Sequence, residues 1–269
     1  MAVFALLYAA VVYLGFLGTF AYAVGFVADL PLLPRTVNHG IAAPPAEALG
    51  IDLALIALFA VQHSVMARQG FKRWWMRVVP EPMERATYVL AATALLALLM
   101  AQWRPIAEPV LWSVQQPAAR LALQGLCAAG WAVALVSTFL IDHCALFGLR
   151  QPWVALRGRA MPDSPFRTPL LYRHVRHPLY LGFLLAFWAT PRMTAGHALF
   201  AAGNTVYILV GVWFEERDLV AQFGPRYRAY RQQAGMLWPR WRRTHSAAGD
   251  STAATGGAES AHTDARNAP

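Results

Sequence analysis

Long apolar segments alternate with polar loops along most of the 269-residue chain. A helix needs about 20 predominantly apolar residues to cross the hydrocarbon core of a bilayer. The apolar segments occupy residues 3–27, 49–66, 86–103, 121–141, 179–190 and 197–214. This pattern predicts an all-α fold, a polytopic integral membrane helical bundle that forms a single domain over residues 1–243. The tail 244–269 is rich in Ala, Ser, Thr and Gly, so we expect it to be disordered.

The last two apolar segments are close together in the chain and should form a short transmembrane hairpin. Residues 191–194 lie between them, and we expect a tight turn there. The arm 179–190 is shorter than the other segments. Whether this arm crosses the bilayer fully as a helix therefore depends on the residues that flank it.

Several polar and aromatic residues have simple interfacial explanations. Asp52 lies in the first turn of its predicted helix, where a carboxylate interacts favourably with the helix dipole. Trp74, Trp75 and Trp103 fit an aromatic belt at the membrane surface. We therefore expect none of these residues to carry out chemistry.

The composition supports a membrane protein. Hydrophobic residues make up 57% of the chain and charged residues only 14%, against roughly 25% charged residues in soluble domains. The net charge of +9 comes from basic residues in short loops beside apolar segments, which argues against a nucleic-acid-binding surface. Cys127 and Cys144 lie within or beside one apolar segment, so we expect neither a disulfide framework nor a metal site.

Lys and Arg residues concentrate in alternate loops, and this bias predicts the orientation in the membrane. Most of them lie in the second loop, in the fourth loop and after the sixth segment: Arg68, Lys72, Arg73, Arg77 and Arg85; Arg150, Arg157, Arg159, Arg167, Arg173 and Arg176; and Arg217, Arg226, Arg228, Arg231, Arg240, Arg242 and Arg243. Because positively charged loops face the cytoplasm, we expect both termini to be cytoplasmic.

Polar residues gather where segments should reach the cytoplasmic side. They include Gln62-His63, Asp142-His143, the stretch 172–177 and Glu215-Glu216. Because these segment ends share one membrane face, we expect them to contribute to one cytoplasmic pocket between the helices. Simpler roles are also open at this point: the histidines and Asp142 as interfacial residues, and Arg173 and Arg176 as topology anchors.

The stretch from Arg176 to Gly182 reads Arg-His-Pro-Leu-Tyr-Leu-Gly, and its chemistry is specific. Pro178 suits the first turn of a helix, so free backbone N–H groups, together with Arg176 and His177, should attract an anion. Tyr180 offers an aromatic face for a sulfonium, and Gly182 permits close approach of backbone or ligand. Opposite them, Glu215 and Glu216 can accept hydrogen bonds from an amine or a ribose. These properties suit S-adenosylmethionine as the cofactor.

These residues also carry a resemblance to a known superfamily. The motif 176–182, Glu215-Glu216 and the stretch 223–231 (Phe-Gly-Pro-Arg-Tyr-Arg-Ala-Tyr-Arg) resemble the C-terminal core of the isoprenylcysteine carboxyl methyltransferase superfamily. The resemblance covers roughly Tyr172 to Tyr230 and implies that Arg176, His177, Pro178, Tyr180, Gly182, Glu215 and Glu216 bind S-adenosylmethionine.

A more discriminating resemblance extends outside this core. The stretches 59–68, 137–143, 146–151 and 166–172 are similar to signatures of the bacterial methanethiol S-methyltransferase family. That resemblance implies methylation of methanethiol to dimethyl sulfide in a bacterial inner membrane. Asp142 departs from the pattern, since an amide is expected there in many members. The nitrite and nitric oxide reductase-associated membrane proteins are also similar.

The implied reaction is an in-line displacement in which a thiolate attacks the sulfonium methyl group. Because an alkanethiol is mostly protonated at neutral pH, a base is needed, and His63 and His143 are the candidates. We assign the acceptor side to Gln62, Asp142, Arg150, Tyr172 and Arg173, and we expect no metal. The acceptor pocket should be small and apolar.

Other functions stay open on the sequence alone. A methyltransferase of the same fold could act on a prenylcysteine or a lipid amine, because the cofactor motif is shared while acceptor motifs are not. A related membrane reductase would bind NADPH and should have more Arg near Glu215. A non-enzymatic membrane partner of a respiratory system is the remaining alternative. The oligomeric state is not predicted by any feature of the sequence.

Overall fold

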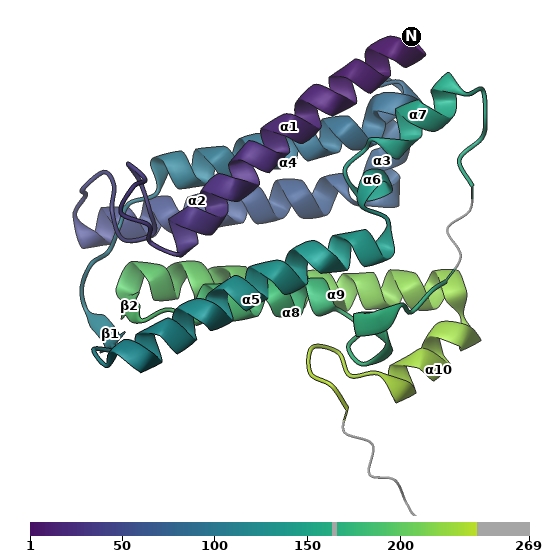
Figure 1. Cartoon of the computed structure of the whole chain (residues 1–269). Coiled ribbons are helices and arrows are strands. Elements are labelled where there is room, and N and C mark those ends of the chain that lie inside the picture. Colours follow the sequence, from purple (N-terminus) through teal and green to yellow (C-terminus); the bar gives the residue numbers. More distant parts are fainter. Residues whose placement is uncertain (163–165, 241–269) are drawn as a thin grey trace, which may run out of the picture.

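The computed structural model describes residues 1–162 and 166–240 and is an all-α bundle, as predicted (Figure 1). The long helices are α1 (Ala2–Val27), α2 (Pro45–Met66), α4 (Glu81–Gln102), α5 (Pro117–Ile141) and α9 (Ala195–Phe223). All of them are long and apolar enough to cross a membrane, so the chain is an integral membrane protein. The shorter elements are α3 (Gln69–Trp75), β1 (Val110–Ser113), α6 (His143–Leu146), α7 (Arg150–Leu156), the 3-10 helix η1 (Leu170–Arg173), α8 (Pro178–Trp188), β2 (Arg192–Thr194) and α10 (Pro225–Gln233). The tail 244–269 lies outside the described residues.

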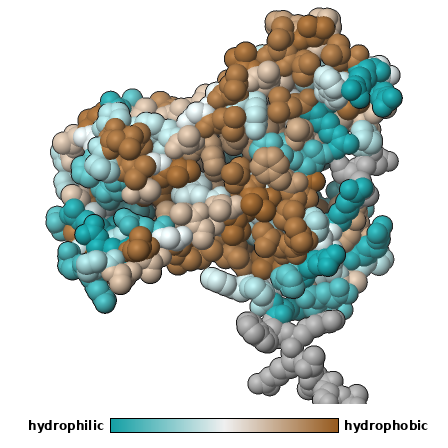
Figure 2. Space-filling view, viewed as in Figure 1, coloured by the Kyte–Doolittle hydropathy of each residue, from teal (hydrophilic) through white to brown (hydrophobic). Residues whose placement is uncertain are grey.

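The long helices pack in two groups. In one group α4 contacts both α1 and α2, and in the other α8 contacts both α5 and α9; contacts between α2 and α9 connect the groups (Figure 1). Figure 2 shows a broad hydrophobic surface between more polar regions of the molecule. Exposed Leu and Val side chains are frequent on α1, α2 and α5. Such a surface suits contact with lipid tails.

The two ends of the bundle differ in composition. At one end, called here the His63 end, α2, α5 and α9 finish and α4 and α8 begin; α3, α6, α7 and α10 also lie there (right side of Figure 1). The opposite end, called the Asp29 end, contains the loop 28–44 and the strands β1 and β2. The Arg-rich loops after α2, α5 and α9 all lie at the His63 end. This is the alternation that the sequence pattern predicted.

Small residues bring α5 and α8 into close contact. A Cβ atom added at Gly182 would lie 2.5 Å from the backbone nitrogen of Ala134 and 2.6 Å from the carbonyl oxygen of Gly130. A Cβ at Gly130 would in turn lie 2.6 Å from the backbone nitrogen of Ala186. Each helix therefore presents a small-xxx-small pair, the pattern that lets membrane helices pack backbone to backbone. Gly182 serves this helix contact, so its surroundings favour a packing role over the cofactor contact expected from sequence.

The fifth segment is a short helix followed by non-helical chain. α8 has 11 residues, which span about 16 Å at 1.5 Å per residue. That is about half of the ~30 Å hydrocarbon thickness of a bilayer. The residues after Trp188 continue without helical structure to β2 at the Asp29 end. The flanking residues therefore complete the path of this arm between the two ends.

The prediction of a tight turn at residues 191–194 is wrong. Arg192–Thr194 forms β2, which pairs antiparallel with β1, and Thr194 lies opposite Val110. The backbone of Val114 also donates a hydrogen bond to the carbonyl of Pro191. The hairpin connection is extended because its backbone groups find partners on a distant part of the chain. No local pattern in the sequence reveals that partner.

The interfacial roles expected for Asp52 and Trp103 are also wrong. α2 begins at Pro45, so Asp52 lies well past the first turn, is fully buried, and accepts a hydrogen bond of 2.9 Å from the backbone N–H of Arg104. Trp103 is 1% exposed, and its indole N–H donates to the carbonyl of Val37 at 3.1 Å. Both residues join α2, α4 and the loop 28–44, because that loop covers the ends of the helices.

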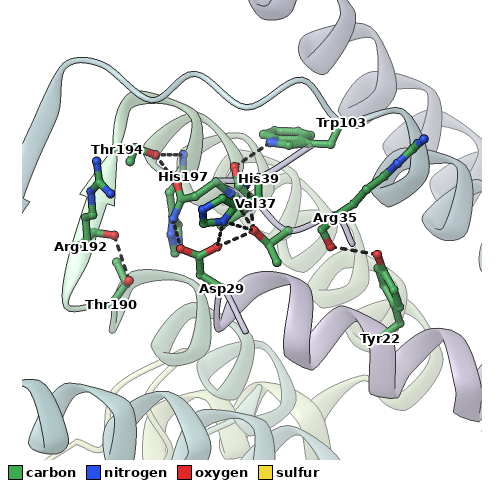
Figure 3. Close-up of polar contacts among 12 residues, drawn as sticks. Tyr22, Asp29, Arg35, Val37, His39, Trp103, Thr190, Arg192, Thr194 and His197 are labelled. Atoms are coloured by element: carbon green, nitrogen blue, oxygen red, sulfur yellow. Dashed lines mark hydrogen bonds and ion pairs between the residues drawn. The ribbon is translucent and has the colours of Figure 1, made fainter. Parts of the chain in front are cut away.

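Polar contacts hold the loop 28–44 at the Asp29 end (Figure 3). The Asp29 carboxylate accepts hydrogen bonds from the Thr36 hydroxyl and, at 2.8 Å, from the Asn38 amide, and it lies 2.9 Å from Nδ1 of His39. The Thr194 hydroxyl donates to the Asn38 side chain at 2.6 Å and accepts from the backbone N–H of His197 at the start of α9. This network fastens the loop to the N-terminus of α9.

Candidate active site

The Glu216 carboxylate is the centre of a buried polar cluster at the His63 end. Its Oε1 lies 2.7 Å from Nε of Arg176 and 3.0 Å from Nε2 of His177, and it accepts a hydrogen bond of 2.9 Å from the Tyr227 hydroxyl. Its Oε2 lies 2.9 Å from Nε of Arg231. The Glu216 side chain is only 10% exposed. Glu216 is thus occupied by groups of its own chain, and it connects α9, the motif before α8, and α10.

The chain after α10 pairs with the Arg-His-Pro motif. The backbone N–H groups of Arg176 and His177 donate to the carbonyls of Gly235 and Met236, at 2.8 and 3.1 Å. Nη1 of Arg176 donates to the carbonyl of Ala234 at 2.6 Å. These bonds use most of the donors of Arg176 within the protein. Sequence reasoning did not identify this clamp, because the pairing joins two loops that lie far apart in the chain.

Glu215 is in a different situation from its neighbour. Its Oε2 accepts a hydrogen bond of 3.0 Å from the Tyr180 hydroxyl and lies 3.7 Å from Nδ1 of His177. Among the described residues, its Oε1 has no hydrogen-bond partner, and the side chain is 44% exposed. Pro178 is the first residue of α8, and no side chain caps that helix. An accessible carboxylate and an uncapped helix N-terminus therefore lie beside each other, joined by Tyr180 and His177.

Tyrosines outside the spanning helices surround this cluster in protonated form. Burial raises the pKa of Tyr227, and its hydrogen bond to Glu216 raises it further. Burial also raises the pKa of Tyr172, followed by the negative charge of Glu215, and raises the pKa of Tyr230 to about 12. The Tyr230 hydroxyl donates to the carbonyl of Tyr172. These tyrosines act as neutral hydrogen-bond donors at physiological pH.

His63 lies near the end of α2 and is enclosed by aromatic rings. The ring centroids of Phe59, Tyr88 and Tyr207 lie 5.4, 5.1 and 6.2 Å from that of His63. Neither ring nitrogen of His63 forms a hydrogen bond within the described part of the chain, and Nδ1 is buried. An imidazole without protein partners keeps its lone pair available for a ligand. This property makes His63 the stronger of the two candidate bases.

Arg85, Tyr88 and Tyr207 were missed by sequence reasoning. The Arg85 guanidinium lies 4.8 Å from the centroid of the Tyr88 ring, and its Nε donates to the carbonyl of Leu146. The Tyr88 ring therefore contacts both Arg85 and His63. Arg85 and Tyr88 are three residues apart on α4 and so share a helix face. That spacing was readable in the sequence, but its relation to His63 depends on how α2 and α4 pack.

His143 has both ring nitrogens occupied. Nδ1 lies 2.7 Å from the Thr138 hydroxyl and Nε2 lies 2.7 Å from the Tyr13 hydroxyl. Because the Thr138 hydroxyl proton is donated to the carbonyl of Leu135, Nδ1 of neutral His143 carries the proton and Nε2 accepts from Tyr13. The ring also stacks on Phe139 at 4.1 Å, and burial lowers the pKa of His143. The environment of His143 is that of a fixed, neutral structural imidazole.

The residues expected on the acceptor side have different surroundings in the structure. Asp142 accepts a hydrogen bond of 3.0 Å from the backbone N–H of Ala145, as the N-cap of α6, and also pairs with Arg150. The Gln62 amide donates to the sulfur of Met66, while its Oε1 is buried without a partner. Asp142 and Arg150 therefore support the α6–α7 region, whereas Gln62 keeps an acceptor available beside His63.

Tyr172 and Arg173 lie in η1, on the side of the Glu216 cluster. Tyr172 is partly buried and near Glu215, whereas Arg173 is exposed. Surface depressions between β1, β2 and α5 lie at the Asp29 end and contain none of the candidate residues. Among the described residues at the His63 end, the groups that keep a polar atom available to a ligand include Glu215, next to Tyr180, and His63 with the neighbouring Gln62.

Comparison with known proteins identifies the family. A methanethiol S-methyltransferase of Mycobacterium tuberculosis is 56% identical over 241 residues, which cover 90% of this chain and 98% of the relative. Methanethiol S-methyltransferase 2 of Bradyrhizobium diazoefficiens is 54% identical over 235 residues, covering 87% and 90%. The chain belongs to the methanethiol S-methyltransferase family. Nurim of Xenopus laevis is more distant, at 33% identity over 168 residues, covering 60% of this chain and 58% of nurim. No family model and no solved structure matches the chain.

Membership of the methanethiol S-methyltransferase family confirms the family that the sequence motifs predicted. It makes the chain a methyltransferase enzyme, so the non-enzymatic respiratory partner and the reductase are set aside. The matched length includes both the Glu216 cluster and the surroundings of His63. A member of this family needs a place for a methyl donor and a place for a thiol, and the His63 end contains two separate groups of available side chains.

Proposed function

We propose that this chain transfers a methyl group from S-adenosylmethionine to methanethiol, giving dimethyl sulfide and S-adenosylhomocysteine. The observation that carries the proposal is the unpartnered imidazole of His63, enclosed by aromatic rings at the same end of the bundle as the Arg-His-Pro motif. The family relationship supports the same reaction. The reaction releases one proton, which the protein has to accept before it reaches water.

The residues around α8 fit the donor. S-adenosylmethionine supplies the electrophilic methyl group when it is bound. Glu215 has one carboxylate oxygen without a partner and can accept hydrogen bonds from an amine or a ribose, while the α8 N-terminus suits a carboxylate. Tyr180 holds Glu215 in place. Glu216 has no spare acceptor of this kind, so its role is to position Arg176 and His177.

His63 is the proposed general base. Its free nitrogen takes the proton from the methanethiol sulfur, and the thiolate sulfur then forms the new bond to the methyl carbon as the old sulfur–carbon bond breaks. Arg85 contacts the Tyr88 ring, which borders His63, and stabilises the thiolate, since a nearby cation lowers the pKa of a thiol. His143 is excluded from this role by its own hydrogen bonds.

We also propose that the His63 end faces the cytoplasm, with both termini inside. The Arg-rich loops after α2, α5 and α9 support this orientation through the positive-inside bias. The donor is made in the cytoplasm, so this orientation gives the site direct access to it. Accessibility of a single Cys introduced at Arg226 or at Arg35, in a background without native Cys, tests the orientation: a membrane-impermeant thiol reagent added to intact cells should label only the second.

The function is tested with membranes that contain the chain, methanethiol and methyl-labelled S-adenosylmethionine, by measuring labelled dimethyl sulfide in the headspace. His63→Gln should reduce turnover by roughly 100-fold or more, the usual contribution of a general base, with donor binding unchanged. His143→Gln is the matched control and should retain most activity once differences in protein amount are corrected.

Two outcomes would contradict parts of this proposal. If the label appeared in lipid or prenylcysteine and not in a volatile product, the acceptor would be a lipid amine or a prenylcysteine and not methanethiol. Full turnover by His63→Gln would remove His63 as the base while leaving the methyl transfer itself established.

A further inference from the structure

The three aromatic rings around His63 come from separate helices. The cluster of Phe59, Tyr88 and Tyr207 is called the aromatic box here. Phe59 comes from α2, Tyr88 from α4 and Tyr207 from α9. The Phe59 and Tyr207 rings also contact each other directly, with centroids 6.0 Å apart and nearly perpendicular planes. Among the described residues, neither ring nitrogen of His63 has a hydrogen-bond partner, and Nδ1 is buried beside these rings.

The box is closed toward the Asp29 end. One turn before Tyr207 on α9, Gly203 packs against Ile56, which lies almost one turn before Phe59 on α2. A Cβ added at Gly203 would lie 2.9 Å from Cδ1 of Ile56, and Ile56 is only 7% exposed. The close contact of α2 and α9 at this level therefore forms a floor. A ligand at His63 has little depth available in that direction.

The box also adjoins the proposed donor site. Tyr207 of the box lies about two turns before Glu215 on α9. The Tyr180 hydroxyl donates to Glu215 at 3.0 Å. The accessible carboxylate and one ring of the box are therefore carried by the same helix, with Glu215 nearer its C-terminal end.

We propose that Phe59, Tyr88 and Tyr207 form the acceptor chamber and that the bulk of these three rings around His63 restricts the acceptor to the shortest neutral alkanethiols. This inference rests on the proposed methyl transfer and specifies its substrate class. A neutral thiol matches surroundings that offer aromatic faces and an imidazole without hydrogen-bond partners. A zwitterionic thiol would bring an ammonium group toward Arg85, whose guanidinium lies over Tyr88, and like charges repel there.

The chamber is tested by changing its size. Phe59→Ala removes one wall without touching His63 or Glu215. Rates with methanethiol, ethanethiol and 1-propanethiol are measured as labelled methyl sulfides under identical conditions. One methylene in an apolar pocket changes kcat/KM by about 10- to 200-fold, so Phe59→Ala should raise the propanethiol-to-methanethiol ratio of kcat/KM at least ~10-fold. Phe59→Leu, a smaller change that preserves more of the packing, should raise it less.

Phe183→Ala is the matched control, because Phe183 packs on Trp131 and Phe187 between α5 and α8 and does not contact His63. It should leave the acceptor ratio unchanged. If Phe59→Ala and Phe59→Leu both keep the parent ratio while they still methylate methanethiol, the chamber assignment is wrong and the proposed function stands. If the parent chain methylates none of the three thiols, the proposed function and the chamber both fail.

Discussion

The two ends of the bundle satisfy their polar groups in different ways. At the Asp29 end, the Asp29 carboxylate is bonded by Thr36, Asn38 and His39, and Thr194 fastens the same loop to α9 (Figure 3). At the His63 end, several buried side-chain atoms have no partner among the described residues: Gln62 Oε1, His63 Nδ1, Trp75 Nε1 and Gln151 Oε1. At the Asp29 end the polar side chains of the loop bond to each other. At the His63 end some buried polar atoms stay available to a ligand.

Unpartnered atoms occur at the Asp29 end too, on side chains that form another hydrogen bond, as Gln62 does at the His63 end. Asp52 has a free Oδ2, yet its Oδ1 accepts from Arg104; His197 has a free Nδ1, yet its Nε2 lies 3.0 Å from the carbonyl of Phe187. His63 has no bonded ring nitrogen at all. Leaving a buried polar group without a partner costs about 1–3 kcal/mol. The difference between the ends therefore points to stability at one end and ligand chemistry at the other.

The largest expected effect comes from Glu216→Gln. Both carboxylate oxygens of Glu216 already have partners within the chain at the His63 end. The substitution leaves Arg176 and Arg231 without a buried partner charge, and breaking such an arrangement costs about 3–5 kcal/mol. The thermal unfolding midpoint in detergent should fall strongly, and activity should be lost with it. Glu215→Gln is the control: it should keep the midpoint and raise KM for S-adenosylmethionine. Equal midpoints for the two variants would show that the proposed division between them is wrong.

Gly182→Ala should have an intermediate effect, and it separates scaffold from cofactor site. The added methyl group collides with the backbone of Gly130 and Ala134, and overpacking of this kind costs about 1–3 kcal/mol. The midpoint should fall while KM for the donor changes little. Gly15→Ala on α1 is the control, because a Cβ at Gly15 meets nothing within 4 Å. A raised KM with an unchanged midpoint would instead place Gly182 among the donor contacts.

Asp29→Asn should have the smallest effect and test the other end. Burial acts to raise the pKa of Asp29, but hydrogen bonds from Thr36, Asn38 and His39 outweigh burial and hold the pKa below its ordinary value. The ionised form therefore stabilises the fold above the unfolded-state pKa, and that contribution is lost as the pH falls through the lower folded-state pKa. Asp29→Asn should cost about 1–2 kcal/mol at neutral pH and leave kcat unchanged.

The acid range gives the sharper measurement for Asp29. The parent should lose part of its stability in strongly acidic solution through this group, and Asp29→Asn should lose less over the same interval. Midpoints measured from neutral to acidic pH compare the two slopes. Parallel slopes would mean that the Asp29 network contributes no pH-dependent stability.

Much of the fold was predictable because a bilayer requires long apolar helices. The helix ends near Val27, Met66 and Ile141 follow the apolar pattern closely. α9 continues to Phe223, well beyond the apolar segment 197–214, because the Glu216 cluster stabilises its polar last turns. The strand β2 was not predictable, since its backbone partners lie on β1.

The sequence by itself determined the membrane class, the alternation of basic loops, the family and the identity of the residues near the site. Only the tertiary structure separated residues that looked equivalent: Glu216 is bound by its own chain while Glu215 is accessible, and His143 is bonded while His63 is free. A sequence motif shows which side chains are present near the site. Whether a lone pair is available depends on hydrogen bonds and rings supplied by distant helices, and packing alone decides those contacts.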